Sequence, residues 1–396
     1  MIAGLARFCN GDIGRAEELA QDALVSALET WPAEGVPRNP GAWLMTTAKN
    51  RQIDLARRSR IFHVKVEELG RELPVSAPEP DPEAIDDDLL SLVFTTCHPV
   101  LSQDAQVALT LRMVGGLKTE EIARAFLVSD KTIGQRISRA KRTLADAEVP
   151  FEVPPPDERP ARIAAVLAVV YLIYNEGYAA TAGEDWMRLD LCEDALRLGR
   201  MLQQLMPREA EVHGLAALME LQSSRLRART APDGSAILLL DQNRQRWDRL
   251  LIDRGLAAIE RAKAIPGGTG PYTLQAEIAA CHARARRSEE TDWHRIAALY
   301  RDLSNRTGSP VVELNRAVAV GMASGPEAGL RVLDAIADDP ALAEYHLLPS
   351  VRGDLLEKAG RGGEAAEEFD RAAAMTRNER EREVLSRRRD ELRAGS

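Results

Sequence analysis

The sequence is poor in the residues that enzymes and metalloproteins gather at their sites. It has four cysteines and six histidines in 396 residues, and they are dispersed along the chain. Cys97-His98 and Cys281-His282 are adjacent pairs, which cannot by themselves build a tetrahedral metal site. No nucleophile–base pair and no phosphate-binding glycine loop emerges. We therefore expect no catalytic residue, no metal and no cofactor, and interpret the cysteines as thiols of a reducing cytoplasm.

The sequence also lacks a signal peptide and an apolar run long enough to cross a bilayer. The longest such run, Ile163 to Tyr174, stops at Asn175-Glu176 and predicts a buried core helix. Aromatic residues make up only 4%, whereas Ala, Leu, Arg and Glu recur throughout, which favours helices over strands. The formal charge of −9 excludes a uniformly basic nucleic-acid binder but not local basic patches. We expect an all-α cytoplasmic protein with no membrane partner.

Two proline-rich stretches divide the chain into three blocks. Residues 73–82 and 149–160 hold four and five prolines, which cannot continue a helix and favour extended spacers. The predicted domains are therefore residues 1–72, 83–148 and 161–396. Turn-forming glycines and prolines break the third block into many short helices.

The clearest chemical pattern is a helix-turn-helix over Thr119–Leu144. Helices are predicted over residues 119–126 and 130–145, with the Ser129 hydroxyl capping the second. Helical spacing turns one set of apolar side chains inward: Ile122, Ala123, Phe126, Ile133, Ile137, Ala140 and Leu144.

The outer face of the second helix is basic in a chain that is acidic overall. From Lys131 to Arg142 there are five basic residues and no acid. Arg and Gln can read base edges in the major groove while Lys, Thr and Arg hold phosphates. The predicted DNA-binding residues on this helix are Lys131, Thr132, Gln135, Arg136, Arg139 and Arg142.

Residues 130–144 resemble the region-four recognition helix of extracytoplasmic-function sigma factors, and the first block resembles region two of the same family. The resemblance implies two partners, core RNA polymerase and promoter DNA. AEELAQDALVSALETW, residues 16–31, resembles the helix that docks on the polymerase clamp. At the family's polymerase-binding positions this helix has Glu18, Gln21 and Asp22, which share one helical face.

NPGAWLMTTAKNRQIDLARR, residues 39–58, resembles the promoter-melting helix. The resemblance implies that one face of the helix is buried and that another contacts the −10 DNA. The buried residues would be Trp43, Leu44, Thr47 and Ala48, and the DNA-contacting residues would be Asn50, Arg51, Arg57 and Arg58. The loop 33–38 lies where the family captures an unstacked base, and its residues equally fit a plain connector. The first proline-rich spacer is long enough to let the modules reach promoter elements several tens of ångströms apart.

The third block contains signs of a helical solenoid. Gly353, Leu356, Ala365, Phe369 and Ala372 have the small-and-large spacing of a tetratricopeptide unit, and a weaker copy includes Ala335 but has Arg316 at the small position. Five segments resemble the tetratricopeptide-like C-terminal extension of one sigma-factor group: NEGY (175–178), LLLDQNRQRWDR (238–249), GPYTLQAEIAACHA (270–283), TDWHRIAALY (291–300) and SPVVELNRAVAV (309–320).

These features predict an alternative sigma factor that is regulated by its fused C-terminal helical domain. Two small helical modules, a region-two bundle and a region-four helix-turn-helix, are followed by a tetratricopeptide-like α-solenoid. The polar segments of the third block are interpreted as contacts between helices, and a groove for a regulatory protein or ligand is the other interpretation. The alternatives are a helix-turn-helix regulator that does not dock on polymerase, and a helical-repeat scaffold.

Overall fold

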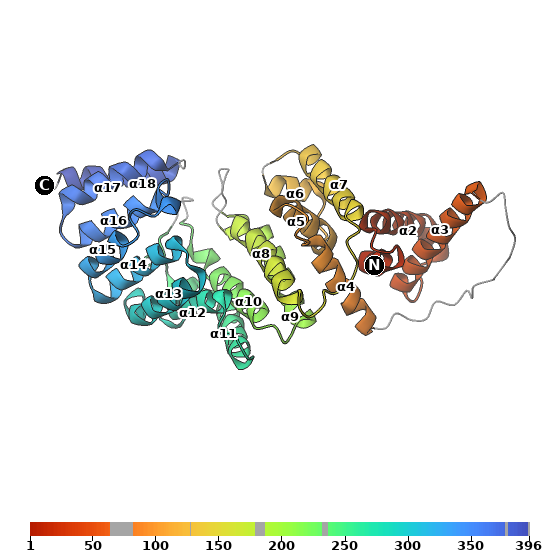
Figure 1. The fold of residues 1–396 in the computed structure, drawn as a ribbon, viewed down its shortest axis with the longest axis horizontal. Helices are drawn as coiled ribbons and strands as arrows, with labels where there is room; N and C mark the ends of the chain where they lie inside the picture. Colours follow the sequence, from red (N-terminus) through yellow and green to blue (C-terminus); the bar gives the residue numbers. More distant parts are fainter. Residues whose placement is uncertain (64–81, 127, 179–186, 232–236, 377–378, 395–396) are drawn as a thin grey trace. The chain divides into compact units, whose positions relative to one another are not determined.

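The computed structural model describes residues 1–63, 82–126, 128–178, 187–231, 237–376 and 379–394. Over these residues the chain is helical and contains no β-strand, which confirms the predicted all-α class (Figure 1). None of the described helices is long and apolar enough to cross a membrane. The chain divides into two compact units, Met1–Leu205 and Met206–Ser396. The predicted domain limits at the proline-rich stretches stay predictions, because the first unit contains both of the first two blocks and two further helices.

The first unit begins with three helices, α1 (Ile2–Phe8), α2 (Ile13–Glu34) and α3 (Pro40–His63). The carboxylate of Asp12 caps α2 by accepting the backbone N–H of Arg15 at 2.8 Å. Of the apolar stripe that four-residue spacing predicts on α2, Leu19, Ala23 and Ala27 are buried and Trp31 is half-buried. The alanines allow close approach of α1 and α3. The shared core consists of Leu5, Ala6, Ala16, Leu19, Ala20, Ala23 and Ala48.

The helix is longer than the resemblance over residues 16–31 predicts, because α2 continues through Pro32 to Glu34 and takes in the start of the expected loop 33–38. The fixed φ of proline fits a helix, and the backbone bond that proline removes lies in the exposed last turns. Gly35 then ends the helix at a φ of +84°, and its N–H donates to the carbonyl oxygen of Trp31 at 2.9 Å.

The middle of the first unit is the predicted helix-turn-helix with its supporting helices. The elements are α4 (Pro82–Thr96), α5 (Gln103–Thr110), a single π-helical turn η1 (Leu111–Gly115), α6 (Thr119–Ala125) and α7 (Asp130–Asp146). Ser129 caps α7 as predicted, since its hydroxyl accepts the backbone N–H of Thr132 at 3.1 Å. Ile122 of α6 and Ile133 of α7 are fully buried, whereas Phe126 is only half-buried. The predicted three-residue turn includes position 127, which lies outside the described residues.

Two more helices, α8 (Arg159–Tyr178) and α9 (Leu189–Leu205), complete the first unit. The apolar run predicted to be a core helix lies in α8, where Ile173 and Tyr174 are completely buried. α8 packs on α9 and also on α4 and α5, and α9 contacts α4 and η1. The helices that follow the second proline-rich stretch therefore pack directly on the helix-turn-helix module.

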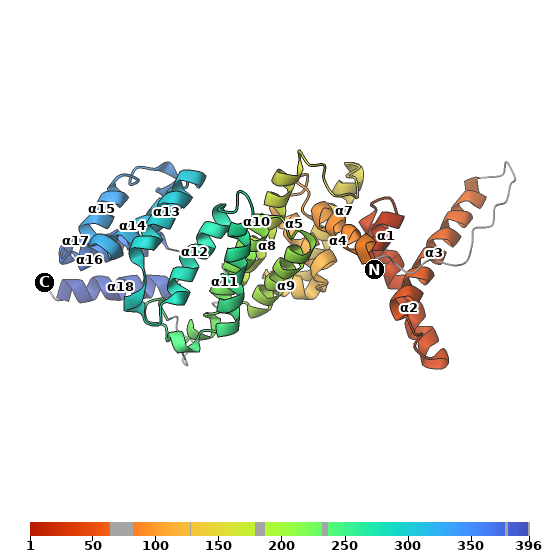
Figure 2. The ribbon, with the colours of Figure 1, turned by 90° about the horizontal axis from the view of Figure 1, so that it is seen from below.

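The second unit is an array in which most helices pack on their neighbours along the chain, and α12 packs on α10 as well as on α13 (Figures 1 and 2). This is the arrangement of a solenoid, as predicted. The long helices are α10 (Ala210–Ser223), α11 (Arg249–Ala264), α12 (Pro271–Arg284), α13 (Trp293–Thr307), α14 (Pro310–Ser324), α15 (Pro326–Asp334), α16 (Leu347–Lys358), α17 (Gly362–Met375) and α18 (Glu379–Ala394). Four 3₁₀ turns connect them: η2 (Leu226–Ala228), η3 (Arg244–Arg246), η4 (Ser288–Glu290) and η5 (Pro340–Leu342).

The tetratricopeptide spacing near the C-terminus describes the packing of α16 on α17. A Cβ atom at Gly353 would lie 2.8 Å from the Phe369 ring, which is fully buried, so only glycine fits beneath it. The weaker copy predicted a packed small residue at Ala335, and this prediction is wrong because Ala335 is exposed. There the close approach uses Gly321 and Gly329, whose added Cβ atoms would meet Leu355 at 2.5 and 2.9 Å.

Replacing Gly353 by alanine should destabilise the second unit by about 1–3 kcal/mol, since the Phe369 ring must leave its packed position. Gly363→Ala is the matched control, because a Cβ there meets nothing within 4 Å. That control should be neutral or stabilise by up to about 1 kcal/mol, since alanine favours the helix. Urea unfolding of the full chain measures both changes, and equal effects of the two substitutions would contradict this packing account.

Candidate nucleic-acid and polymerase interface

The outer face of α7 carries the predicted DNA-binding side chains in open positions. Lys131, Thr132, Gln135, Arg139 and Arg142 are exposed. Ile133, Ile137, Ala140 and Leu144 of the same helix are buried, so the predicted division into an inner and an outer face agrees with the structure. The outer face therefore presents three cations, a hydroxyl and an amide on one rigid helix, a set suited to a DNA groove.

Two basic residues of α7 are engaged within the protein. Arg136 is half-buried and its guanidinium lies 3.0 Å from the carboxylate of Asp104, which is itself well exposed. Such an exposed pair contributes little and can be exchanged for a phosphate contact. Lys141 turns to the opposite side of α7 and bonds to Glu17 of α2.

The predicted polymerase-binding side chains lie on the exposed side of α2. Glu18, Gln21 and Asp22 are all exposed. Next to them is an apolar surface that the sequence prediction missed: Leu24, Val25 and Leu28 are 47%, 53% and 76% exposed. The sequence could have indicated this surface, because the three residues lie outside the buried Leu19-Ala23-Ala27 stripe of the helix. A polar edge beside exposed aliphatic side chains is typical of a protein-binding surface.

The residues expected to contact the −10 DNA lie on α3. Asn50 and Arg51 are exposed, and the Arg51 guanidinium lies 3.4 Å from the Asp22 carboxylate across the α2–α3 contact. The side chains of Arg57 and Arg58 lie outside the described residues, so their predicted roles stay predictions.

The face of α3 that was expected to be buried is only partly so. Ala48 is buried, whereas Trp43, Leu44 and Thr47 are half-buried. Trp43 packs edge-on against Trp31, with 5.4 Å between the ring centroids. This aromatic pair fixes the end of α2 against the start of α3, on either side of the loop 33–38.

A single carboxylate joins the N-terminal helices to the helix-turn-helix module. Glu17 accepts two hydrogen bonds from the Arg112 guanidinium at 2.9 and 2.6 Å, and a third from the Lys141 ammonium. The three side chains are 13%, 24% and 21% exposed. Burial acts to raise the pKa of Glu17, but the bonds and charges of Lys141 and Arg112 outweigh it and lower the pKa. Phe151, just after the module, packs on the core of α1–α3 as well.

Three arginines bind the carboxyl ends of helices in the helix-turn-helix module. They are Arg162 of α8, Arg197 of α9 and Arg188, which directly precedes α9. Arg162 donates to the carbonyl oxygen of Phe94 at 2.7 Å and Arg197 to that of Gly115 at 2.6 Å. Arg188 donates to the carbonyl oxygen of Ala125. These carbonyls lie in the last turns of α4, η1 and α6, where unpaired carbonyl groups and the helix dipole favour a cation.

The polar segments of the third block act between helices, as the sequence analysis interpreted them. Glu176 of the NEGY segment pairs with Arg188 and so helps to orient it. Arg244 donates to the carbonyl oxygens of His282 and Ala285 and to the hydroxyl of Thr291, at 2.7–3.0 Å. Among the described residues, no three His, Cys, Asp or Glu side chains are arranged to hold a metal ion.

The Glu17 contact predicts a specific pH dependence of stability. Because its folded pKa is depressed, its contribution is fully present above the ordinary glutamate value near 4.5 and is lost as the pH falls through the folded pKa. Glu17→Gln should therefore lower the free energy of unfolding by about 1–3 kcal/mol at pH 7. The difference from the wild type should shrink towards pH 3. Urea unfolding across this range measures it, with exposed Glu18→Gln as the control, and a difference independent of pH contradicts the assignment.

Comparison with known proteins agrees with this geometry. Residues 1–61 match the family described as sigma-70 region 2, and residues 91–144 match the family described as sigma-70, region 4. Residues 162–263 match a family of unknown function, DUF6596. An uncharacterized protein of Rhizobium meliloti (strain 1021) is 44% identical over 399 residues, covering 100% of this chain and 93% of the relative. The chain belongs to the sigma-70 family and is similar to its extracytoplasmic-function members, with a C-terminal extension that contains the DUF6596 region.

Proposed function

We propose that this chain is an alternative sigma factor whose activity is regulated by its own C-terminal helical extension. Sigma-70 family proteins are transcription initiation factors, and regions 2 and 4 support binding to core RNA polymerase and to promoter DNA. The observation that carries the proposal is the presence, in one compact unit, of an exposed docking face on α2 and an exposed basic recognition face on α7. No catalytic role is proposed for any residue.

Polymerase binding is assigned to α2. Glu18, Gln21 and Asp22 supply the polar part of the contact, and Leu24, Val25 and Leu28 supply apolar area. The aliphatic surface favours this assignment over a helix-turn-helix regulator that binds DNA alone, since such a regulator has no need for it.

DNA binding is assigned to α7 and α3, the two helices for which the sequence predicts it. The exposed side chains of α7 would enter the major groove at the −35 element, and Asn50 and Arg51 of α3 would contact the −10 element. Arg57 and Arg58 belong to the same proposal on the strength of the sequence alone.

Regulation by the extension rests on the arginine contacts. Arg162, Arg188 and Arg197 bind the ends of three region-four helices, and α8 and α9 pack on the same module. A change in the extension therefore has a direct physical route to the helices that position α7. The proposed partner that would use this route is a regulatory protein or ligand bound to the C-terminal domain.

The Glu17 contact implies a second level of control. With α2 held to η1 and α7, the two DNA-binding modules lie in one compact body. Promoter elements lie several tens of ångströms apart, and we propose that the two modules separate in order to reach both. Binding to polymerase would therefore have to break the Glu17 bonds and separate the modules.

Two single substitutions should separate docking from promoter recognition. Leu28→Asp should abolish co-elution with core polymerase, because a carboxylate would be buried without a partner. Arg139→Ala should leave co-elution intact but lower run-off transcription about tenfold, the effect of one lost groove contact. Exposed Arg301→Ala is the control for both. If both variants transcribe as the wild type does, the proposed docking and recognition surfaces are wrong.

Uncoupling the extension should change transcription even though the DNA-binding face stays intact. The double variant Arg162→Gln/Arg197→Gln removes two carbonyl contacts, and run-off transcription with core polymerase should rise or fall at least threefold, a change of about 0.7 kcal/mol. Residues 1–148 alone should give a change of the same sign. Exposed Arg208→Gln is the control, and unchanged transcription by both the double variant and the truncated chain would refute regulation by the extension.

A further inference from the structure

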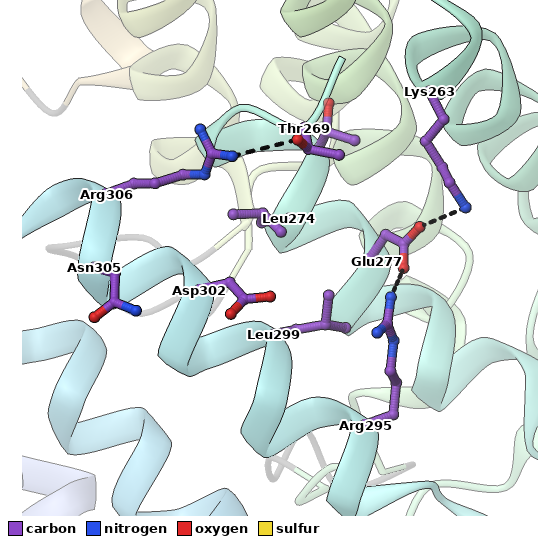
Figure 3. Close-up of a pocket in the computed structure, with 10 residues that line it drawn as sticks. Lys263, Thr269, Leu274, Glu277, Arg295, Leu299, Asp302, Asn305 and Arg306 are labelled. Atoms are coloured by element: carbon purple, nitrogen blue, oxygen red, sulfur yellow. Dashed lines mark hydrogen bonds and ion pairs between the residues drawn. The ribbon is translucent and has the colours of Figure 1, made fainter. Parts of the chain in front are cut away.

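Two cavities among the described residues of the second unit differ in size and lining. The larger, about 440 Å³, lies between α12 and α13 and is lined mostly by polar and charged side chains (Figure 3). These charges already satisfy one another. The buried Glu277 carboxylate lies 3.1 Å from the Lys263 ammonium and 3.0 Å from the Arg295 guanidinium, and Arg306 reaches Thr269 at 3.4 Å. None of its described lining residues has a buried polar atom without a partner, so nothing there calls for a ligand.

The smaller cavity, about 220 Å³, lies among α10, α12, α13 and α14. Aliphatic side chains form about half of its lining, and they include Leu218, Leu221, Ile278, Leu303 and Val312. A cavity of this size and lining suits a compact apolar body of about a dozen non-hydrogen atoms, smaller than a drug-sized ligand.

Four separate segments of the extension meet at this smaller cavity. Trp247 comes from the segment 238–249, His282 from 270–283, Tyr300 from 291–300 and Asn315 from 309–320. These segments resemble the extension of one sigma-factor group, and the proposed promoter and polymerase contacts use none of them. Their convergence on one cavity gives these motifs a common location.

Three side chains that line the smaller cavity have a buried polar atom without a hydrogen-bond partner. The atoms are Oε1 of Gln222, Nε1 of Trp247 and Nδ1 of His282. An unpaired buried polar group costs free energy, so three around one cavity require an explanation. An acceptor at one end of an apolar ligand could bind the Trp247 N–H, and His282 Nδ1 in its protonated tautomer, whereas Gln222 Oε1 needs a donor.

The electrostatic environment of the cavity favours an anion. Arg225 lines it, and the nearby Arg244 is only 5% exposed. The hydrogen bonds of Arg244 go to two carbonyl oxygens and a hydroxyl, and the acids that act on it, Glu289 and Glu290, are exposed. Burial, together with the charges of Arg244 and Arg225, lowers the pKa of His282 to about 4. The imidazole is thus neutral at pH 7 beside two cations.

We propose that this cavity is the binding site of a small organic acid, a monocarboxylate with an apolar aliphatic or aromatic body. The body would pack against the leucine and isoleucine walls. The carboxylate would be attracted by Arg225 and would accept a hydrogen bond from the Trp247 indole N–H. The inference deepens the proposed regulation by the extension, since it names the ligand class, but its test measures binding alone and does not depend on transcription.

Isothermal titration calorimetry of the full chain with 4-phenylbutyrate tests the proposal. The matched probe is 4-phenylbutan-1-ol, which keeps the apolar body and replaces the carboxylate by a hydroxyl. The acid should bind saturably, one per chain, and at least tenfold more tightly than the alcohol. If the acid does not bind at millimolar concentration, or binds no better than the alcohol, the proposal is overturned without recourse to any variant.

Three variants locate the site. Ala279→Phe places a ring in the cavity from the half-buried face of α12 and should abolish binding of both probes. Arg225→Gln should weaken the acid about tenfold and leave the alcohol unchanged. Arg306→Gln, in the larger cavity, should change neither. Binding that survives Ala279→Phe, or that Arg306→Gln removes, overturns the assignment. Thermal melting identifies a variant that fails to fold. In that case, the relative affinity of the wild-type chain for the acid and the alcohol tests the proposal without the variant.

Discussion

One carboxylate determines how the parts of the first unit are held together. Glu17 projects from α2 into a site where Arg112 and Lys141 converge on it, away from most of the solvent. A buried carboxylate is unfavourable by itself, and two cations with three hydrogen bonds make it favourable here. Because the contact is ionic, it depends on both cations and on the charge of the carboxylate.

The arginines of the extension use the same principle at a different kind of site. Helix ends leave carbonyl groups unpaired, and a guanidinium can satisfy them while it complements the helix dipole. Arg162, Arg188 and Arg197 occupy three such ends in region four. The extension is thereby bound to the scaffold of the recognition helix and leaves the exposed outer face of α7 open.

The sequence predicts what depends on local periodicity and cannot predict what depends on distant partners. The inner face of α7, its Ser129 cap and the Gly353–Phe369 contact follow from spacing within a helix or a repeat. The Glu17 contact does not, because its partners lie 95 and 124 residues away along the chain. The weaker repeat was misplaced for a related reason: Gly321 and Gly329 meet across two helices, and their fit depends on Leu355 of a third. The exposure of Leu28 likewise depends on which faces of α2 the other helices leave uncovered.

The central claim is that α2 and α7 are held together in the free protein and separate on polymerase. Spin labels at exposed Glu29 of α2 and exposed Ser138 of α7, each introduced as cysteine, allow pulsed electron paramagnetic resonance to measure this distance directly. The free protein should give one short-distance population, and added core polymerase should shift it outwards by several tens of ångströms, as the promoter elements require. The same distance distribution with and without polymerase, in a complex that transcribes, would contradict the account.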